Sequence, residues 1–223
     1  MSSLLLLNGS PRGPRGNSMK MLSHVAEGWQ RSGGQAPEVL HLAHRADFER
    51  AVAAFAEADV VMLGMPLYTD AMSGLVKEYI EALADRVGAA PGSNPRLAFL
   101  VQSGFAEACH SRPVERYLAK LASRLGSPYA GTIVRGSGES LQSMPDEANK
   151  KLWERLAVLG EELATTGVFS AESLAAVSGI ERFSAGQVLL ARAAYSLPIS
   201  QFYFSNQLKK NGAWGKRFAA PYA

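Results

Sequence analysis

Runs of hydrophobic residues recur along the chain, and each of them stops at glycine, proline or polar residues. The first run, Leu4 to Leu7, is closed by Asn8-Gly9-Ser10-Pro11. A short unbroken apolar run between turn residues is typical of a strand buried on both faces of a parallel sheet. The same pattern predicts five buried strands, at residues 4–7, 39–42, 60–64, 97–101 and 129–134.

The segments between these strands repeat apolar positions at helical spacing. Met19, Leu22 and Trp29 fall near one face of a helix that begins at about Ser18. Further helices are predicted at residues 48–55, 75–83, 113–125 and 145–165. Strands that alternate with helices in this way favour an α/β fold. We expect a doubly wound five-stranded parallel sheet of order 2-1-3-4-5 with helices on both faces.

Residues 168–223 extend beyond this alternation, so the chain is divided into a domain at 1–167 and a C-terminal helical extension. Two short helices are predicted in the extension, at residues 171–178 and 185–195. Disordered segments usually lack aromatic residues, whereas this one contains Phe202, Tyr203, Phe204, Trp214, Phe218 and Tyr222. The extension is therefore expected to pack on the domain or on a second subunit, with a lid over the active site as the alternative.

Composition excludes several classes of protein. The chain of 223 residues has a formal net charge of +3, but its basic residues are scattered, so no nucleic-acid partner is expected. A single cysteine, Cys109, excludes a disulfide within one chain, and we expect no iron–sulfur cluster and no structural zinc site held by cysteines within one chain. The apolar runs are too short for a signal peptide or a membrane span. We therefore expect a cytoplasmic protein without a membrane partner.

Candidate chemistry lies in the loops that follow the strands. In an open α/β sheet, ligands bind at the carboxyl ends of the strands, where the strand order reverses. The loops at 8–18, 65–73 and 103–111 should meet there, with 135–144 less central. In the first loop, glycines, hydroxyl and amide groups and a helix start would form a monophosphate site, to which Arg12 or Arg15 could add a bidentate contact. The alternative is a polar loop in which Asn17 or Ser18 caps the helix.

Three segments resemble one known family. The run Gly9-Ser10-Pro11-Arg12…Gly16-Asn17-Ser18 resembles the FMN phosphate loop of the NADPH-dependent FMN reductases and flavodoxin-like NAD(P)H oxidoreductases. Pro66-Leu67-Tyr68…Lys77 and Gln102-Ser103-Gly104-Phe105-Ala106-Glu107 resemble the second and third flavin loops of that family. The resemblance covers about residues 3–165.

This resemblance implies noncovalent FMN and a site made of ten residues. The phosphate would be held by Ser10, Arg12, Asn17 and Ser18. One side of the isoalloxazine would be lined by Pro66, Leu67 and Tyr68, and the other by Ser103, Gly104 and Phe105. The flavin N5 carries the chemistry, so no catalytic side chain is expected, and Tyr68 and His110 are candidate proton donors.

The implied activity is oxidation of NADPH or NADH, with electrons passed to a small acceptor such as a quinone or a flavin, in a homodimer. One alternative is a flavodoxin-type electron carrier, although such carriers are typically acidic and this sequence has a pI of about 9.0. The other alternative is a flavin-free binding protein of the same fold. Cys109 is interpreted as a packing residue, and no metal site is expected.

Overall fold

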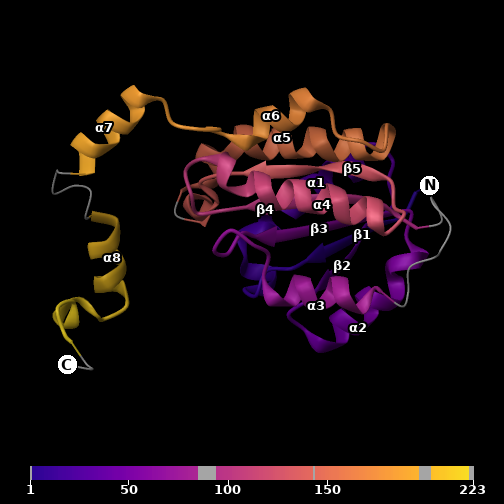
Figure 1. The fold of residues 1–223 in the computed structure, drawn as a ribbon, viewed down its shortest axis with the longest axis horizontal. Coiled ribbons are helices and arrows are strands. Elements are labelled where there is room, and N and C mark those ends of the chain that lie inside the picture. The colour runs from indigo at the N-terminus through magenta and orange to yellow at the C-terminus, as the bar shows by residue number, and fades with distance from the viewer. Residues whose placement is uncertain (1, 85–93, 143, 196–201, 221–223) are drawn as a thin grey trace. The chain divides into compact units, whose positions relative to one another are not determined.

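The sheet has the predicted strands and the predicted order. The structure, a computed structural model, describes residues 2–84, 94–142, 144–195 and 202–220 (Figure 1). Its strands are β1 (Leu4–Asn8), β2 (Glu38–His41), β3 (Val60–Pro66), β4 (Arg96–Gln102) and β5 (Tyr129–Arg135). They pair in parallel in the order β2-β1-β3-β4-β5. The predicted fold class is therefore confirmed.

Helices cover both faces of this sheet. They are α1 (Asn17–Arg31), α2 (Arg45–Ala54), α3 (Gly74–Ala82), α4 (Arg112–Arg124), α5 (Asp146–Thr165) and α6 (Ala171–Ser178). In the view of Figure 1, α2 and α3 lie below the strands, and α5 and α6 lie above them. None of the helices in the described ranges is long and apolar enough to cross a membrane.

The continuous apolar runs supply two separate cores. Along β1, Leu5 and Leu7 pack into the core beneath α2, α3 and α4, whereas Leu4 and Leu6 pack into the core beneath α1 and α5. Successive side chains of a strand point to opposite faces of the sheet, so a strand covered on both faces needs apolar residues at every position. This requirement explains the unbroken Leu4–Leu7 run.

Two glycines allow α1 and α5 to pack backbone against backbone. A Cβ atom built on Gly28 would lie 1.8 Å from the carbonyl oxygen of Ala157, and one built on Gly160 would lie 1.9 Å from that of Val25. Real Cβ atoms do not approach so closely, so both positions require glycine. The contact fixes α1, the helix that follows the first predicted cofactor loop.

The first compact unit of the chain runs from Met1 to Glu181, past the boundary that the sequence placed after residue 167. The reason is that residues 168–181 contribute to the second core. Phe169 and Val177 are buried there, and the N–H of Phe169 donates to the carbonyl oxygen of Ala130 on β5 at 2.9 Å. Helix α6 forms at the predicted residues.

The second unit, Arg182–Ala223, contains α7 (Ala185–Tyr195), as predicted, and α8 (Phe202–Lys210). By itself it has no buried residue in its described part. Its local contacts include Arg217, which lies 4.2 Å from the ring centre of Trp214. Large apolar side chains of this unit are exposed, among them Leu189, Leu190, Phe202, Phe204 and Phe218. That the extension packs on the domain or on a second subunit stays a prediction.

Candidate functional site

The loops that follow β1, β3 and β4 meet at the carboxyl edge of the sheet and form one cleft. It is lined by Ser10, Arg12, Asn17, Pro66, Leu67, Tyr68, Gln102, Ser103, Gly104 and Glu139. Eight of these residues belong to the ten predicted from the sequence, so three separate segments converge as expected. Ser18 and Phe105 are not among the lining residues.

The cleft itself is small. Its open volume is about 50 Å³, below the roughly 300–1,000 Å³ of typical ligand pockets. Tyr68 and Phe105 are each 45% exposed at its edge loops. A flat heterocycle would therefore lie largely on the open side of the cleft.

Asn8 organises the loop after β1 from its interior. Its side chain is buried, its amide Nδ2 donates to the carbonyl oxygen of Gly13 at 2.8 Å, and its Oδ1 accepts from the backbone N–H of Ser10 at 3.1 Å. These two bonds hold the loop in a tight turn in which Gly13 has a φ of 57°. This left-handed conformation favours glycine.

His41, at the end of β2, belongs to the same network. Its Nδ1 lies 3.0 Å from Asn8 Nδ2. Because Nδ2 is a donor, as its bond to Gly13 requires, His41 Nδ1 must accept and the ring must be neutral. Burial lowers the pKa of His41 below its ordinary value of 6.5, an effect that Asp47 opposes and His44 reinforces. The pKa shift and the hydrogen bond thus favour the same neutral form.

This arrangement predicts a pH dependence of stability. Because the pKa of His41 is lower in the folded protein than in the unfolded chain, the unfolded chain binds more protons just below pH 6.5, and the free energy of unfolding falls as the pH falls. The His41→Gln variant should lose this component. Urea unfolding between about pH 7.5 and about pH 5.5, which bracket the ordinary histidine pKa, measures the difference. Equal slopes for the two proteins would contradict the assignment.

Helix α1 begins directly at the cleft. Its N-terminal cap, Gly16, provides no side-chain hydrogen bond to the first turn. The N–H of Met19 donates to the carbonyl oxygen of Gly16, so an anion at this end would be bound by the N–H groups that precede it. A Cβ atom on Gly16 would lie 2.6 Å from Ser10 Oγ, and glycine therefore keeps the space beside Ser10 open. Asn17 Nδ2 donates to the carbonyl oxygen of Gly138 at 2.7 Å, and this bond ties the helix start to the segment after β5.

The loop after β3 forms a tight hairpin that presents Tyr68. The backbone groups of Tyr68 and Ala71 bond to each other at 2.9 and 3.2 Å. The two residues between them, Thr69 and Asp70, have φ values of 46° and 65°. Positive φ at both central residues is the geometry of a type I′ turn. Leu67, in contrast, is buried at the base of the cleft.

The loop after β4 is hydrogen-bonded to the loop after β5. Its first residues face the cleft, whereas Phe105 does not line it. The carbonyl oxygens of Ser103 and Phe105 accept from the N–H groups of Gly138 and Ser137, both at 2.6 Å. Ser103 and Gly104 face the cleft. The ring of Phe105 instead stacks against His110, with ring centres 4.5 Å apart. Of the two candidate proton donors, Tyr68 lines the cleft and His110 does not.

Two lining residues were not among the predicted site residues. Gln102, the last residue of β4, is buried, and its Nε2 donates to Ser18 Oγ at 3.4 Å. Glu139 lies in the short helix Gly138–Gln142, and its Oε1 pairs with Arg12 Nη1 at 3.4 Å. Glu139 belongs to the loop at 135–144, which the sequence predicts to lie nearer the margin of the site than the other three loops. Arg15, the other arginine considered for the phosphate, is not among the lining residues.

Features of the cleft fit the polar groups of a flavin mononucleotide. Asn17 Oδ1 and Ser103 Oγ are buried and have no hydrogen-bond partner within the described residues. Such buried groups usually have a partner, and a ribityl hydroxyl or a ring N–H could bond to them. The helix start and Arg12 suit the phosphate. The donor set is therefore compatible with the cofactor that the sequence motifs imply.

Comparisons with known proteins agree with this fold. Residues 2–97 match the family model described as a flavodoxin-like fold. No curated protein matches the chain. Solved structures that are similar to it include an FMN-dependent NADH-azoreductase from Bacillus anthracis str. Ames Ancestor in complex with FMN. The two chains share 16% identity over 74% of this chain and 100% of the other, with a TM-score of 0.57.

Two further solved structures are similar over most of this chain. One is an NAD(P)H:quinone oxidoreductase from Methanothermobacter marburgensis, with 14% identity, 73% of this chain and 96% of the other covered, and a TM-score of 0.55. The other is an NADH:FMN oxidoreductase in its apo form, with 15% identity over 83% of this chain and 98% of the other, and a TM-score of 0.56. The family match and the sheet order agree with the resemblance found in the three sequence motifs: the chain has a flavodoxin-like fold.

Proposed function

We propose that the chain binds FMN at the cleft and acts as an NAD(P)H-dependent oxidoreductase that passes electrons to a small acceptor such as a quinone or a flavin. The observation that carries this proposal is the convergence of eight implied flavin residues, from three separate loops, on one cleft. The similar solved structures are described as FMN-dependent or NAD(P)H-dependent enzymes, and this description supports the same kind of activity.

Each part of the cleft has a task in this proposal. The phosphate is bound by the first turn of α1, by Ser10 Oγ and by the guanidinium of Arg12. Tyr68 presents its exposed ring to the isoalloxazine, and Leu67 closes the apolar base. Ser103 Oγ, buried without a partner in the described part of the chain, bonds to a polar atom of the ring.

Bound FMN supplies the redox chemistry by accepting hydride from NADPH or NADH, while the protein supplies position and electrostatics. The open side of the cleft leaves room for the nicotinamide, and afterwards for the acceptor. Because Tyr68 is exposed there, its hydroxyl can donate a proton to an acceptor that has taken up electrons.

The proposal is tested by titrating the purified protein with FMN and then adding NADH or NADPH without oxygen. We expect saturable quenching of flavin fluorescence and loss of the visible flavin band in one two-electron step. Accumulation of a stable one-electron form with little NAD(P)H oxidation would favour the electron carrier. Absence of saturable binding would favour a flavin-free protein.

A matched pair of glycine variants shows whether FMN occupies this cleft. Gly16→Ala places a methyl group 2.6 Å from Ser10 Oγ, whereas a Cβ atom on Gly74 meets no atom within 4 Å. Gly16→Ala should therefore weaken FMN binding, and Gly74→Ala should leave it unchanged. Equal affinity in both variants would place the flavin elsewhere.

Glu139 should limit the affinity of the site for FMN. Its carboxylate pairs with the guanidinium of Arg12 and would lie beside the bound phosphate. Glu139→Gln therefore removes a group that competes with the phosphate for Arg12, and it removes a negative charge that would repel the phosphate. Because Arg12 and Glu139 are 53% and 52% exposed, we expect only about 2–5-fold tighter binding, in keeping with the small energies of exposed ion pairs. Fluorescence titration at low and high salt measures the change, which should shrink at high salt.

The arginine variants provide the control for this prediction. Arg12→Gln should weaken FMN binding about 10-fold or more, since a hydrogen bond to a charged group contributes about 1.5–3 kcal/mol. Arg15→Gln should have little effect, because Arg15 is not among the residues that line the cleft. A larger loss for Arg15→Gln than for Arg12→Gln would reverse the assignment of the phosphate contact.

A further inference from the structure

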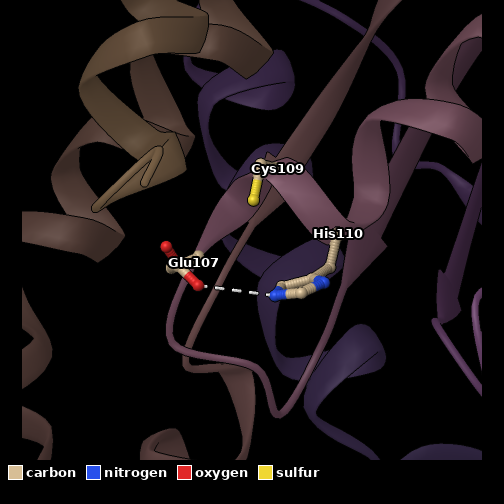
Figure 2. Close-up of side chains that lie close together, drawn as sticks. All are labelled: Glu107, Cys109 and His110. Carbon is tan, nitrogen blue, oxygen red and sulfur yellow. Dashed lines mark ion pairs between the residues drawn. The ribbon is translucent and has the colours of Figure 1, made fainter. Parts of the chain in front are cut away.

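Glu107, Cys109 and His110 form a cluster outside the residues that line the cleft. Figure 2 shows their side chains pointing toward one another, with the sulfur of Cys109 above the line that joins the carboxylate to the imidazole. One ligand atom from each residue lies within 4.8 Å of the other two. His110 Nε2 is 3.5 Å from Glu107 Oε2. All three residues are half-buried.

The backbone beneath this cluster is held by the end of the first unit. Glu107 forms a parallel bridge with Ile180. The N–H groups of Ala108 and Cys109 donate to the carbonyl oxygens of Ile180 and Glu181 at 2.8 and 3.1 Å. The short helix Ala108–Ser111 then leads directly into α4. The three side chains therefore extend from a fixed backbone, and little backbone entropy remains to be lost when a ligand joins them.

The ring of His110 is also oriented by its surroundings. It stacks on Phe105 with ring centres 4.5 Å apart and an interplanar angle of 32°. The ring edge that carries Nε2 faces Glu107, as the ion pair in Figure 2 shows. The imidazole thus already presents a nitrogen toward the space between the carboxylate and the thiol.

The chemistry of the three groups points to one class of ligand. A thiolate, an imidazole and a carboxylate are the ligands that Zn²⁺ takes in proteins, with bonds of roughly 2.3, 2.0–2.1 and 2.0–2.2 Å respectively. In a tetrahedral site such bonds separate the ligand atoms by about 3.5 Å, so modest side-chain rotations would bring the observed atoms to that distance. Mg²⁺ and Ca²⁺ prefer oxygen ligands, and sulfur and nitrogen disfavour them here.

We propose that Glu107, Cys109 and His110 bind a thiophilic divalent cation, Zn²⁺, with water in the fourth position. The thiol proton passes to the solvent when the cation binds. This site goes beyond the proposed flavin chemistry, because the three residues and the residues of the cleft form separate sets. This proposal differs from the expectation from sequence, which is that Cys109 packs in the interior and that the chain has no metal site.

The test uses Co²⁺ as a spectroscopic substitute for Zn²⁺. A cobalt–thiolate bond gives an intense ultraviolet charge-transfer band, and Cys109 is the single cysteine of the sequence, so any such band reports on this residue. We expect the band to saturate at one Co²⁺ per chain and to disappear when Zn²⁺ is added. Absence of the band, or saturation at one Co²⁺ per two chains, would overturn the proposal.

Single substitutions separate a three-ligand site from a thiol that binds metal alone. Cys109→Ser should abolish the band. Glu107→Gln and His110→Gln should each weaken Zn²⁺ binding by about 10-fold or more, since even loss of a ligand's outer partner typically costs about 10–100-fold. Zn²⁺ affinity that is unchanged in either of these two variants would overturn the three-ligand site.

The chain contains a matched control for these variants. His24 and Glu27 form another histidine–carboxylate pair three residues apart, with 3.0 Å between His24 Nδ1 and Glu27 Oε2, but no cysteine accompanies them. His24→Gln should leave the cobalt band and the Zn²⁺ affinity unchanged. Circular dichroism without metal shows that each variant is folded. Zn²⁺ should raise the melting temperature of the parent protein but not of Cys109→Ser.

Discussion

Alanine in place of Gly160 is expected to destabilise the first unit by about 3 kcal/mol or more, at the upper end of the usual cost of overpacking. The added methyl carbon would lie 1.9 Å from the carbonyl oxygen of Val25 and 2.8 Å from the backbone nitrogen of Trp29. Both neighbours are backbone atoms of α1, so no side chain can rotate away. The two helices would have to separate, and the buried Leu22, Leu156 and Leu159 would lose contacts between them.

Close packing and helix propensity predict opposite signs for the change in stability when glycine is replaced by alanine. In an exposed helix, alanine stabilises by roughly 1 kcal/mol relative to glycine. Gly74→Ala, where the added atom meets nothing within 4 Å, should be neutral or stabilising. Urea denaturation of both variants provides the comparison. Gly160→Ala with parental stability would show that α1 and α5 pack less closely than the structure indicates.

Removal of the Asn8 side chain is expected to have the second largest effect, on both stability and cofactor binding. Asn8→Ala leaves the N–H of Ser10 and the Nδ1 of His41 without the partner that Asn8 provides, whereas the carbonyl oxygen of Gly13 keeps its bond from the N–H of Gly16. Buried groups left unpaired cost about 1–3 kcal/mol each, so we expect a loss of about 2–4 kcal/mol in unfolding free energy. The loop that places Ser10 and Arg12 at the cleft would no longer be held, and FMN affinity should fall by about 10-fold or more.

Asn149 provides the matched control for Asn8. It is also a buried asparagine, but it lies on α5, and its amide donates over longer distances, at 3.4 and 3.5 Å, to the carbonyl oxygens of Pro145 and Leu141. Asn149→Ala should lower stability less and leave FMN affinity unchanged. Chemical denaturation and FMN titration of both variants separate the two effects. Equal FMN affinity in Asn8→Ala and the parent would contradict the organising role of Asn8.

The sequence by itself determined the sheet and the place of the cleft. Unbroken apolar runs such as Leu4–Leu7 identify strands covered on both faces, because each face must bury every second residue. Parallel strands end at the same edge of a sheet, so loops that follow strands in the sequence must meet in space. For this reason the loops that contain Ser10, Pro66 and Ser103 were predicted to meet although they lie far apart in the chain, and the structure places all three residues in one cleft.

What the sequence did not determine depends on contacts across loops and between segments. The direction of the Phe105 ring follows from its contact with His110, and the presence of Arg12 but not Arg15 among the residues that line the cleft follows from the path of the loop after β1. The division of the chain after Glu181 rather than after residue 167 reflects the burial of Phe169 against β5. Each of these depends on a partner distant in sequence.

The cluster of Glu107, Cys109 and His110 also depends on partners distant in the sequence, although its three residues lie within a segment of four. In the sequence, the three residues do not form a recognised metal-binding motif. Their proximity in the sequence does not show that their side chains meet, because neighbouring side chains in a strand or loop can point in different directions. The tertiary structure decided their convergence, because the bonds from Ala108 and Cys109 to Ile180 and Glu181 fix the backbone turn that points all three side chains to one space.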